Sequence, residues 1–364
     1  MRRKRNGMRS AMPGVGIGGS SRGHPTFRWS IMLLLCEGLR VDVEAETWRD
    51  REFDRGRPPD DGVISAICRR HGFAGASARP LATTGLVNWI YAIGDEAVLR
   101  IPATANPDAV EDAYTESVAV PAVVAAGVKT PRLLVFDDSA ELTEVPYTIY
   151  ELVSGTDLGS LSLDDGDAPA IYESVGRELA QLHGDVTSVP DPDHRLNEPG
   201  RWTTAAFAEG LQTKGFLDPN SVAIVADLWQ RLSPALEGAD TFRRFLHQDL
   251  KTTNLMSSSG RFAAIIDWGD AGWGDPALEF RYLPMKAAAW ALAGYRDVMP
   301  IDGDDTAEAR ILWDQLWCAV WQVDFRPTPR PRGSNRDRPG ARLVDLIGFL
   351  TSHIGRDWLD RAGI

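Results

Sequence analysis

The chain has 364 residues and an apolar content of 43%, which can bury the cores of two lobes, and it shows no long periodic repeat of the kind that builds a solenoid. Its formal net charge of −12 disfavours a nucleic-acid partner, because a nucleic-acid-binding face carries clustered Lys and Arg. The three cysteines lie far apart and form no Cys-x-x-Cys pair, which predicts a reducing, cytoplasmic location and no structural zinc.

The first residues of the chain imitate a signal peptide without completing one. Basic residues crowd positions 2–9, but the apolar run Ile31–Cys36 is shorter than the roughly seven to fifteen residues of a secretory core. The run ends at Glu37, and no small-residue cleavage site follows. We therefore predict that residues 1–45 form a disordered extension and that the protein has no membrane partner. A further hypothesis places the translation start at Met32, and native peptides upstream of that residue would contradict it.

The next segment has the pattern of a small sheet. Gly94 supplies a hairpin turn between the first two of four β-rich runs, which cover residues 88–93, 97–101, 132–136 and 147–153. A helix is expected between the second and third runs. Asn106 and Pro107 are typical of its start, and it should run through Glu116 and then kink or end at Pro121. Together these elements predict a nucleotide-binding N-terminal lobe over residues 46–153.

Beyond residue 153 the sequence is mainly helical. Apolar residues recur at helical spacing in five segments, which are residues 168–182, 222–236, 277–295, 307–323 and 341–359. The proline-rich segment 326–340 is expected to be an exposed extended loop. We predict a helical C-terminal lobe over residues 154–364.

One stretch of this lobe contains candidate catalytic and metal-binding residues. His247, Asp249 and Asn254 form a His-x-Asp-x-x-x-x-Asn pattern, and a predicted hairpin at 255–266 leads into Asp267. Phosphoryl transfer needs a positioned hydroxyl group and cations that neutralise the phosphates. Asp249 is therefore predicted to accept or orient the proton of a substrate hydroxyl. Asn254 and Asp267 supply oxygen ligands of the kind that Mg²⁺ prefers.

At these residues, and along 265–277 with its Gly-Asp-Pro turn, the chain resembles the aminoglycoside phosphotransferase and choline kinase-like family. The resemblance covers roughly residues 81–297. It implies an α+β, protein-kinase-like fold of two lobes, with a small antiparallel sheet in the N-terminal lobe and a mostly helical C-terminal lobe that holds the acceptor.

The resemblance also implies an activity. A small-molecule kinase of this family moves the γ-phosphoryl group of ATP or GTP onto a hydroxyl of an acceptor such as an aminoglycoside or macrolide antibiotic, with Mg²⁺ as cofactor. Choline, homoserine or a sugar are alternative acceptors. The motifs leave the acceptor, the choice between ATP and GTP, and the oligomeric state open.

Further residues acquire roles from the family pattern. Arg100 stands where a strand lysine normally holds the phosphates, and Glu116 stands where a helix carboxylate pairs with that lysine. The other implied nucleotide contacts are Thr84 and Gly85 in the loop over the phosphates, and the backbone of Glu151 and Val153 at the hinge that binds adenine.

Plainer alternatives stay open for several of these residues. Arg100 and Glu116 could be an ordinary ion pair. The predicted catalytic and metal-binding residues could be turn residues, since Asp and Asn favour loops. His247 is expected to brace the loop through backbone hydrogen bonds rather than to catalyse. Acidic residues that could bind a cationic acceptor, or simply be solvated surface, are Asp191, Asp193, Glu198, Asp302, Asp304 and Asp305.

Three departures from the family pattern leave open a nucleotide-binding scaffold that has lost turnover. Arg100 replaces the usual Lys, Gln248 replaces Gly, and Glu279 replaces Asp. The longer side chain of Glu279 leaves open whether this position still bonds to the catalytic loop.

Overall fold

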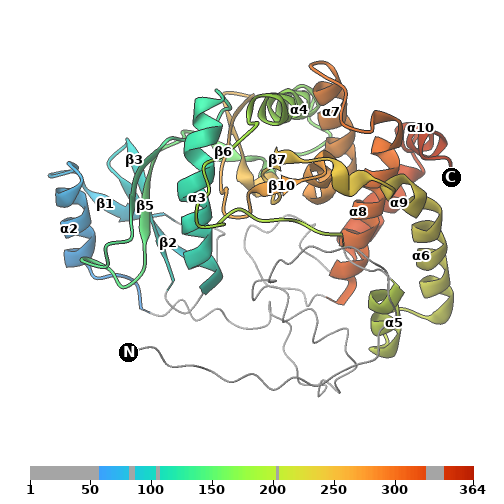
Figure 1. Cartoon of the computed structure of the whole chain (residues 1–364), viewed down its shortest axis with the longest axis horizontal. Coiled ribbons are helices and arrows are strands. Elements are labelled where there is room, and N and C mark those ends of the chain that lie inside the picture. The colour runs from blue at the N-terminus through green and yellow to red at the C-terminus, as the bar shows by residue number, and fades with distance from the viewer. Residues whose placement is uncertain (1–56, 82–86, 104–106, 202–204, 325–339) are drawn as a thin grey trace. The chain divides into compact units, whose positions relative to one another are not determined.

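The computed structural model describes residues 57–81, 87–103, 107–201, 205–324 and 340–364. All of these fall in one compact unit of strands and helices (Figure 1). Within them, no helix combines the length and the apolar character that crossing a bilayer requires. The extension predicted at residues 1–45 lies outside the described residues. The α+β class is confirmed, with a small antiparallel sheet and many helices.

Five antiparallel strands form the main sheet, in the order β1-β2-β3-β5-β4. Their bounds are Ala78–Pro80 for β1, Asn88–Ile93 for β2, Ala97–Pro102 for β3, Leu133–Asp137 for β4 and Tyr147–Glu151 for β5. The predicted hairpin is confirmed, and in it Ile93 pairs with Ala97 and Asn88 with Pro102. Gly94 turns the chain with a φ of 54°, which glycine adopts without steric penalty.

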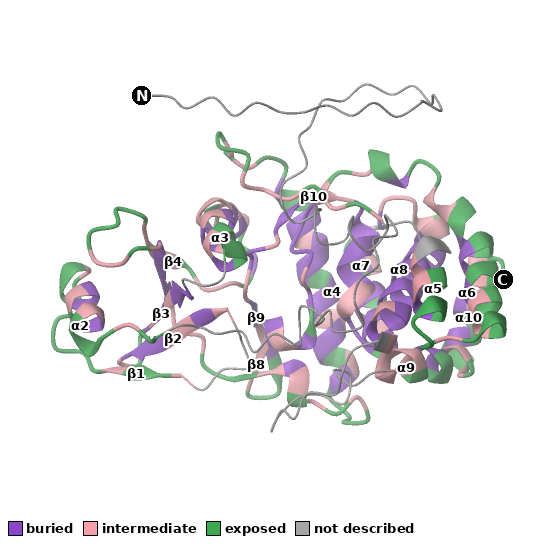
Figure 2. Ribbon diagram, turned by 90° about the horizontal axis from the view of Figure 1, so that it is seen from below, coloured by how far each residue is buried: buried purple, intermediate pink, exposed green. Residues whose placement is uncertain are grey.

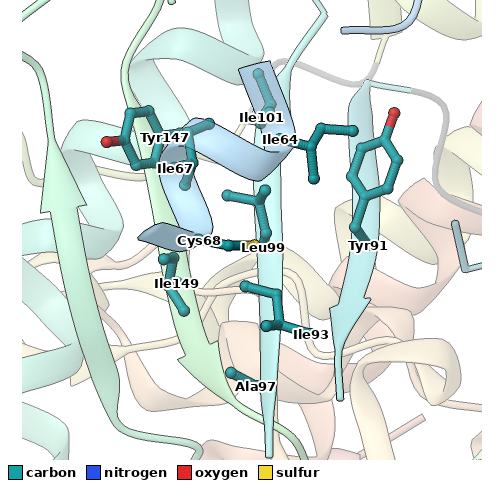
Figure 3. Close-up of a cluster of buried hydrophobic side chains, with 10 residues drawn as sticks. All are labelled: Ile64, Ile67, Cys68, Tyr91, Ile93, Ala97, Leu99, Ile101, Tyr147 and Ile149. Carbon is teal, nitrogen blue, oxygen red and sulfur yellow. The ribbon is translucent and has the colours of Figure 1, made fainter. Parts of the chain in front are cut away.

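One face of this sheet is apolar and lies against helix α2 (Asp61–Arg70), as Figure 3 shows. Ile64, Ile67 and Cys68 recur at helical spacing and so share one face of α2. They pack in one cluster with strand residues that include Leu99 and Ile149, both fully buried. This apolar layer is the core of the sheet.

The opposite face of the sheet carries polar groups. Successive side chains of a strand point to opposite faces, so Leu99 in the apolar cluster places Arg100 on the other side. By the same alternation, Ile149 places Tyr150 there. Helix α3 (Pro107–Ala125) brings Glu116, which is only 2% exposed, to this polar face.

Helix α3 does not end at Pro121, although an early end was one of the two expected effects. It continues to Ala125 with Pro121 inside it. Proline removes one helical hydrogen bond, but Val120 and Val123 on either side of it are buried, and tertiary packing of an apolar face outweighs the lost bond.

The helical part of the chain begins with α4 (Ala168–Asp185), whose inner residues are buried (Figure 2). The other helices are α5 (Ala205–Thr213), α6 (Pro219–Leu232), α7 (Met285–Arg296), α8 (Ala307–Trp321), α9 (Ala341–Leu350) and α10 (His353–Ala362). Helices α4 and α7 cross with their backbones almost touching. A Cβ on Gly176 would lie 1.8 Å from the carbonyl oxygen of Ala291, and one on Gly294 would lie 2.0 Å from that of Glu173. Both positions therefore require glycine.

Two small sheets carry the segments around Asp249. Strand β7 (Arg244–Leu246) pairs with β10 (Gly272–Gly274), and β8 (Leu255–Ser258) lies between β6 (Thr156–Asp157) and β9 (Arg261–Ile265). The predicted hairpin at 255–266 is confirmed as β8 and β9. Ser259 and Gly260 turn it, with φ angles of 52° and 72°.

Two predicted helices are wrong as single elements. Residues 277–295 form a 3₁₀ helix, η5 (Pro276–Tyr282), and then α7, because Pro284 cannot continue a helix from within. Residues 341–359 form α9 and α10, because the Ser352 side chain accepts the amide of Gly355 and starts a new helix. The predicted loop at 326–340 lies outside the described residues except for its last position.

Candidate active site

The loop between β7 and β8 brings Asp249 and Asn254 together. The 3₁₀ helix η4 (Thr252–Asn254) folds the chain back, and Asn254 Nδ2 donates to Asp249 Oδ2 and to its carbonyl oxygen, both at 3.0 Å. Asn254 is 4% exposed, so its amide is fixed in place. Its nitrogen is used by Asp249, which leaves the amide oxygen as the atom available to a cation.

Arg100, Glu116 and Asp267 meet on the polar face of the main sheet. Arg100 Nη1 donates to Glu116 Oε1 at 2.5 Å, and Arg100 Nη2 donates to Asp267 Oδ1 at 2.7 Å. Tyr150 donates its hydroxyl to the other oxygen of Glu116 at 2.6 Å. The structure thus joins the main sheet, helix α3 and Asp267, which lies two residues after β9, although the three are far apart in sequence.

Lys251 is a site residue that the sequence analysis missed. Its Nζ donates to Asp249 Oδ2 at 2.6 Å, and its side chain is 46% exposed. Although burial acts against it, the charges of Asp249 and Asp267 raise the pKa of Lys251 above its usual value, so the side chain stays cationic. The only signal in the sequence is a cation two residues after Asp249.

His247 braces this loop, as expected. Its Nε2 lies 2.9 Å from the carbonyl oxygen of Ile266, and its Nδ1 accepts the amide of Asp249 at 3.2 Å. The ring packs edge-on against Trp268, with centroids 4.7 Å apart. His247 is fully buried, so these contacts link the catalytic loop to the segment that carries Asp267.

Glu279 does bond to the catalytic loop. Its two oxygens accept the amides of His247 at 2.5 Å and Gln248 at 3.2 Å. The carboxylate is fully buried, and His183 Nε2 lies 3.7 Å from it. Burial opposes the charged form, but the nearby His183 imidazole and the bond from the His247 amide lower the pKa of Glu279. The longer side chain therefore keeps the bond that was in question.

The electrostatics separate the two central carboxylates. Burial raises the pKa of Asp249, with Lys251 acting in the opposite direction and Asp270 adding to the rise. For Asp267 burial also acts upward, but Arg100 and Lys251 outweigh it and lower the pKa. Asp249 therefore takes up a proton more readily than Asp267, and Asp267 stays ionised. A proton acceptor requires the first property, and a cation ligand requires the second.

The predicted hinge lines a cavity of about 460 Å³, whose walls include Glu151, Leu152 and Val153. The rest of the wall comes from residues 129–131, from Glu96 and from two alanines of β9. Arg100, Asp249, Asn254 and Asp267 do not line this cavity. The Glu151 side chain is held by Arg132. Thr84 and Gly85 lie outside the described residues.

Most of the acidic residues that could have bound a cationic acceptor are already used. Asp302 pairs with Arg244 through both oxygens, at 2.6 and 2.9 Å. Asp191 accepts the amides of residues 195 and 196, Glu198 pairs with Arg243, and Asp304 pairs with Arg296. No such bond marks Asp193 or Asp305 as part of a site.

The donor set fits Mg²⁺ better than a metal caged by the protein. Within the described residues, no group of three or more His, Cys, Asp and Glu could hold an ion. Asn254 and Asp267 offer one amide and one carboxylate oxygen, and Mg²⁺ is commonly bound by few protein oxygens together with phosphates and water.

Comparison with known proteins identifies the family of the chain. The model of the phosphotransferase enzyme family (APH) matches residues 82–323. The resemblance found in the sequence, over roughly residues 81–297, begins at nearly the same position, and the family match ends further along the chain. No protein of curated function matches the chain.

Solved structures show the same fold. One is a choline/ethanolamine kinase family protein from Mesorhizobium loti, with a TM-score of 0.54, 18% identity and coverage of 83% of this chain and 97% of that one. Another is a mutant of aminoglycoside 2'-phosphotransferase-IIIa in complex with GDP, with a TM-score of 0.50, 17% identity and coverage of 71% and 89%. The chain therefore belongs to the phosphotransferase enzyme family and has its kinase-like fold.

Proposed function

We propose that the protein is a small-molecule kinase that transfers the γ-phosphoryl group of ATP or GTP to a hydroxyl of its acceptor. The observation that carries this proposal is the ion pair of Arg100 with both Glu116 and Asp267, which stands beside a loop that holds Asp249 against Asn254 and Lys251. A positioned carboxylate, cations and metal-binding oxygens are the parts that phosphoryl transfer uses.

Asp249 would act on the acceptor. The hydroxyl oxygen attacks the γ-phosphorus, the bond to the leaving phosphate oxygen breaks, and the hydroxyl proton passes to the Asp249 carboxylate. Hydrogen bonds from Asn254 and Lys251 fix one oxygen of that carboxylate and leave the other for the proton. Lys251, half exposed beside it, would neutralise charge on the transferred group.

Arg100 would hold the phosphates. Its guanidinium has the fork geometry that suits phosphate oxygens, and Glu116 and Tyr150 fix its direction. Asn254 and Asp267 would hold Mg²⁺, which when bound neutralises phosphate charge. The backbone of Glu151 and Val153 would take the base, with Thr84 and Gly85 over the phosphates.

The contacts favour turnover over an inactive scaffold. Arg100 makes the ion pair expected of a lysine at that position, and Glu279 makes the loop bond expected of an aspartate. We therefore regard both departures as compatible with catalysis. Their partners are intact, and each substitution keeps the charge of the residue it replaces.

The acceptor is a small molecule, with an aminoglycoside or macrolide antibiotic as first candidate and choline, homoserine or a sugar as alternatives. Asp302, Asp304 and Glu198 already pair with arginines, so a cationic acceptor would have to compete for these three carboxylates. We propose a cytoplasmic enzyme without nucleic-acid or membrane partners.

The test is nucleotide consumption by purified protein with Mg²⁺ against a panel of aminoglycosides, macrolides, choline, homoserine and sugars. Acceptor-dependent turnover that is lost in Asp249→Ala is the expected result. Nucleotide binding without turnover on any acceptor would count against the kinase and for the scaffold.

A further inference from the structure

Gln248 has an unusual backbone conformation immediately before Asp249. Its φ is 68°, in the left-handed region that residues other than glycine rarely adopt. Such a conformation persists only where the surrounding structure holds it, and these residues cluster at functional sites. The Gln248 side chain is also confined, because a Cβ on Gly272 would lie 2.7 Å from its Nε2. Neighbouring groups must therefore impose this turn.

Two residues of η5 hold the backbone of Gln248 from both sides. Glu279 Oε2 accepts the amide of Gln248 at 3.2 Å, and Arg281 Nη2 donates to its carbonyl oxygen at 3.1 Å. That carbonyl belongs to the peptide that leads into Asp249. Arg281 therefore fixes the peptide plane from which the Asp249 side chain projects.

The surroundings of Arg281 keep it in place without using all its donors. Its guanidinium carbon lies 4.7 Å from the centroid of the Tyr282 ring. The backbone on both sides is anchored by Gln315, whose Nε2 donates to the carbonyl oxygens of Phe280 at 2.5 Å and Leu283 at 2.8 Å. Arg281 Nε is buried and has no hydrogen-bond partner among the described residues. The guanidinium therefore acts on the loop before Asp249 through Nη2, which donates to the Gln248 carbonyl.

We propose that Arg281 is a positioning residue for phosphoryl transfer. By holding the Gln248 carbonyl, it keeps the left-handed turn that directs the Asp249 carboxylate at the acceptor hydroxyl. The inference rests on the proposed function. Glutamine at position 248 makes the chain depend on Arg281, because glycine would adopt the same turn without being held.

The test compares Arg281→Met in the natural chain and in a Gln248→Gly background, with kcat and Mg-nucleotide affinity measured for each protein. In the natural chain we expect kcat to fall about tenfold or more, with nucleotide affinity unchanged, because small displacements of a catalytic group are costly. In the Gln248→Gly background the loss should be less than about threefold, since glycine removes the strain. Equal losses in both backgrounds would overturn the proposal.

Arg342→Met is the matched control. Arg342 also lies over the Tyr282 ring, at 5.8 Å, but it donates to the carbonyl oxygens of Arg281 and Tyr282 in η5 itself. We expect this variant to lower the melting temperature and to keep kcat. A kcat loss equal to that of Arg281→Met would assign the effect to a loosened η5 and contradict a positioning role.

A crystal structure of the variant gives a readout that needs no acceptor. In Arg281→Met, φ of Gln248 should leave the left-handed region, and retention of the natural φ would overturn the proposal. If Arg281→Met does not fold, Arg281→Lys takes its place in the same comparison. Its ammonium group can still donate a hydrogen bond, so we expect a partial loss of kcat. Absence of turnover in the natural protein would refute the proposed function, whereas normal turnover with unaffected Arg281 variants would refute only this inference.

Discussion

Leu99 and Arg100 are neighbours on β3, yet they belong to regions with opposite physical demands. Leu99 is fully buried in the apolar layer under α2, where burial itself is favourable (Figure 3). Arg100 lies on the other face with its side chain 15% exposed, and Glu116 and Asp267 pair with its charge. The apolar face therefore serves stability, whereas the charged face carries a desolvation cost that its ion pairs offset.

Among the changes that test this comparison, removing the charge of Arg100 should have the largest effect. We expect Arg100→Met to lower kcat by about 10²–10³-fold, the range found when one preorganised donor to a transition state is removed. Arg100→Lys is the control, because it keeps the charge and should recover most of the loss. A kcat in Arg100→Met within threefold of the natural protein would mean that the ion pair is only structural.

Shortening a side chain of the apolar face should lower the stability of the protein and leave turnover unchanged. We expect Leu99→Ala to lower the free energy of unfolding by about 2–5 kcal/mol, as for other buried Leu→Ala changes. Denaturant unfolding measures the loss, and kcat per folded molecule at low temperature should stay unchanged. A large fall in kcat for the folded fraction would show that the two faces are not independent.

A change at Lys251 tests how neighbouring charge sets the pKa of Asp249, the proposed proton acceptor. We expect Lys251→Met to lower kcat about tenfold, which corresponds to one charge-assisted hydrogen bond of about 1.5 kcal/mol. The pKa of Asp249 is raised by burial and opposed by Lys251, so the variant should raise it further. Since the base must be ionised, the acid limb of the pH–rate profile should move to higher pH. An unmoved limb would exclude this coupling.

The smallest predicted effect concerns Asp137, at the edge of the α2 side. Burial acts against ionisation, but hydrogen bonds from Ser139 and Tyr147 lower the pKa of Asp137 to about 2. A lowered pKa contributes stability that is present above the unfolded value near 4 and is lost as pH falls towards 2. Unfolding free energy should therefore decline less across this range in Asp137→Asn than in the natural protein. An equal decline of the unfolding free energy in the two proteins would show that Asp137 makes no such contribution.

The sequence predicted most of what is local. The hairpins at 88–101 and 255–266 follow from β-rich apolar runs on either side of turns that contain glycine, and both occur in the structure. The break before α7 could also have been read from Pro284, since proline cannot lie inside a helix without loss. Helix α2 was missed, although Ile64, Ile67 and Cys68 have helical spacing.

The long-range contacts of the site could not be predicted in the same way. The spacing of Asp249, Asn254 and Asp267 pointed to one site, but it does not show that Arg100 reaches across 167 residues to Asp267. The bond of Arg281 to Gln248 likewise spans 33 residues and depends on how η5 packs. Periodicity reports which face is buried, whereas such bonds depend on tertiary placement.

The most direct test of the account measures phosphoryl transfer and Mg-nucleotide affinity for the natural protein and Asp249→Asn in parallel. The substitution keeps the shape of the side chain and removes its ability to accept a proton. We predict acceptor-dependent transfer that falls by about 10²–10⁴-fold in the variant, as for loss of a general base, with nucleotide affinity unchanged. Equal transfer by both proteins would contradict the proposed role of Asp249 and its neighbours in phosphoryl transfer.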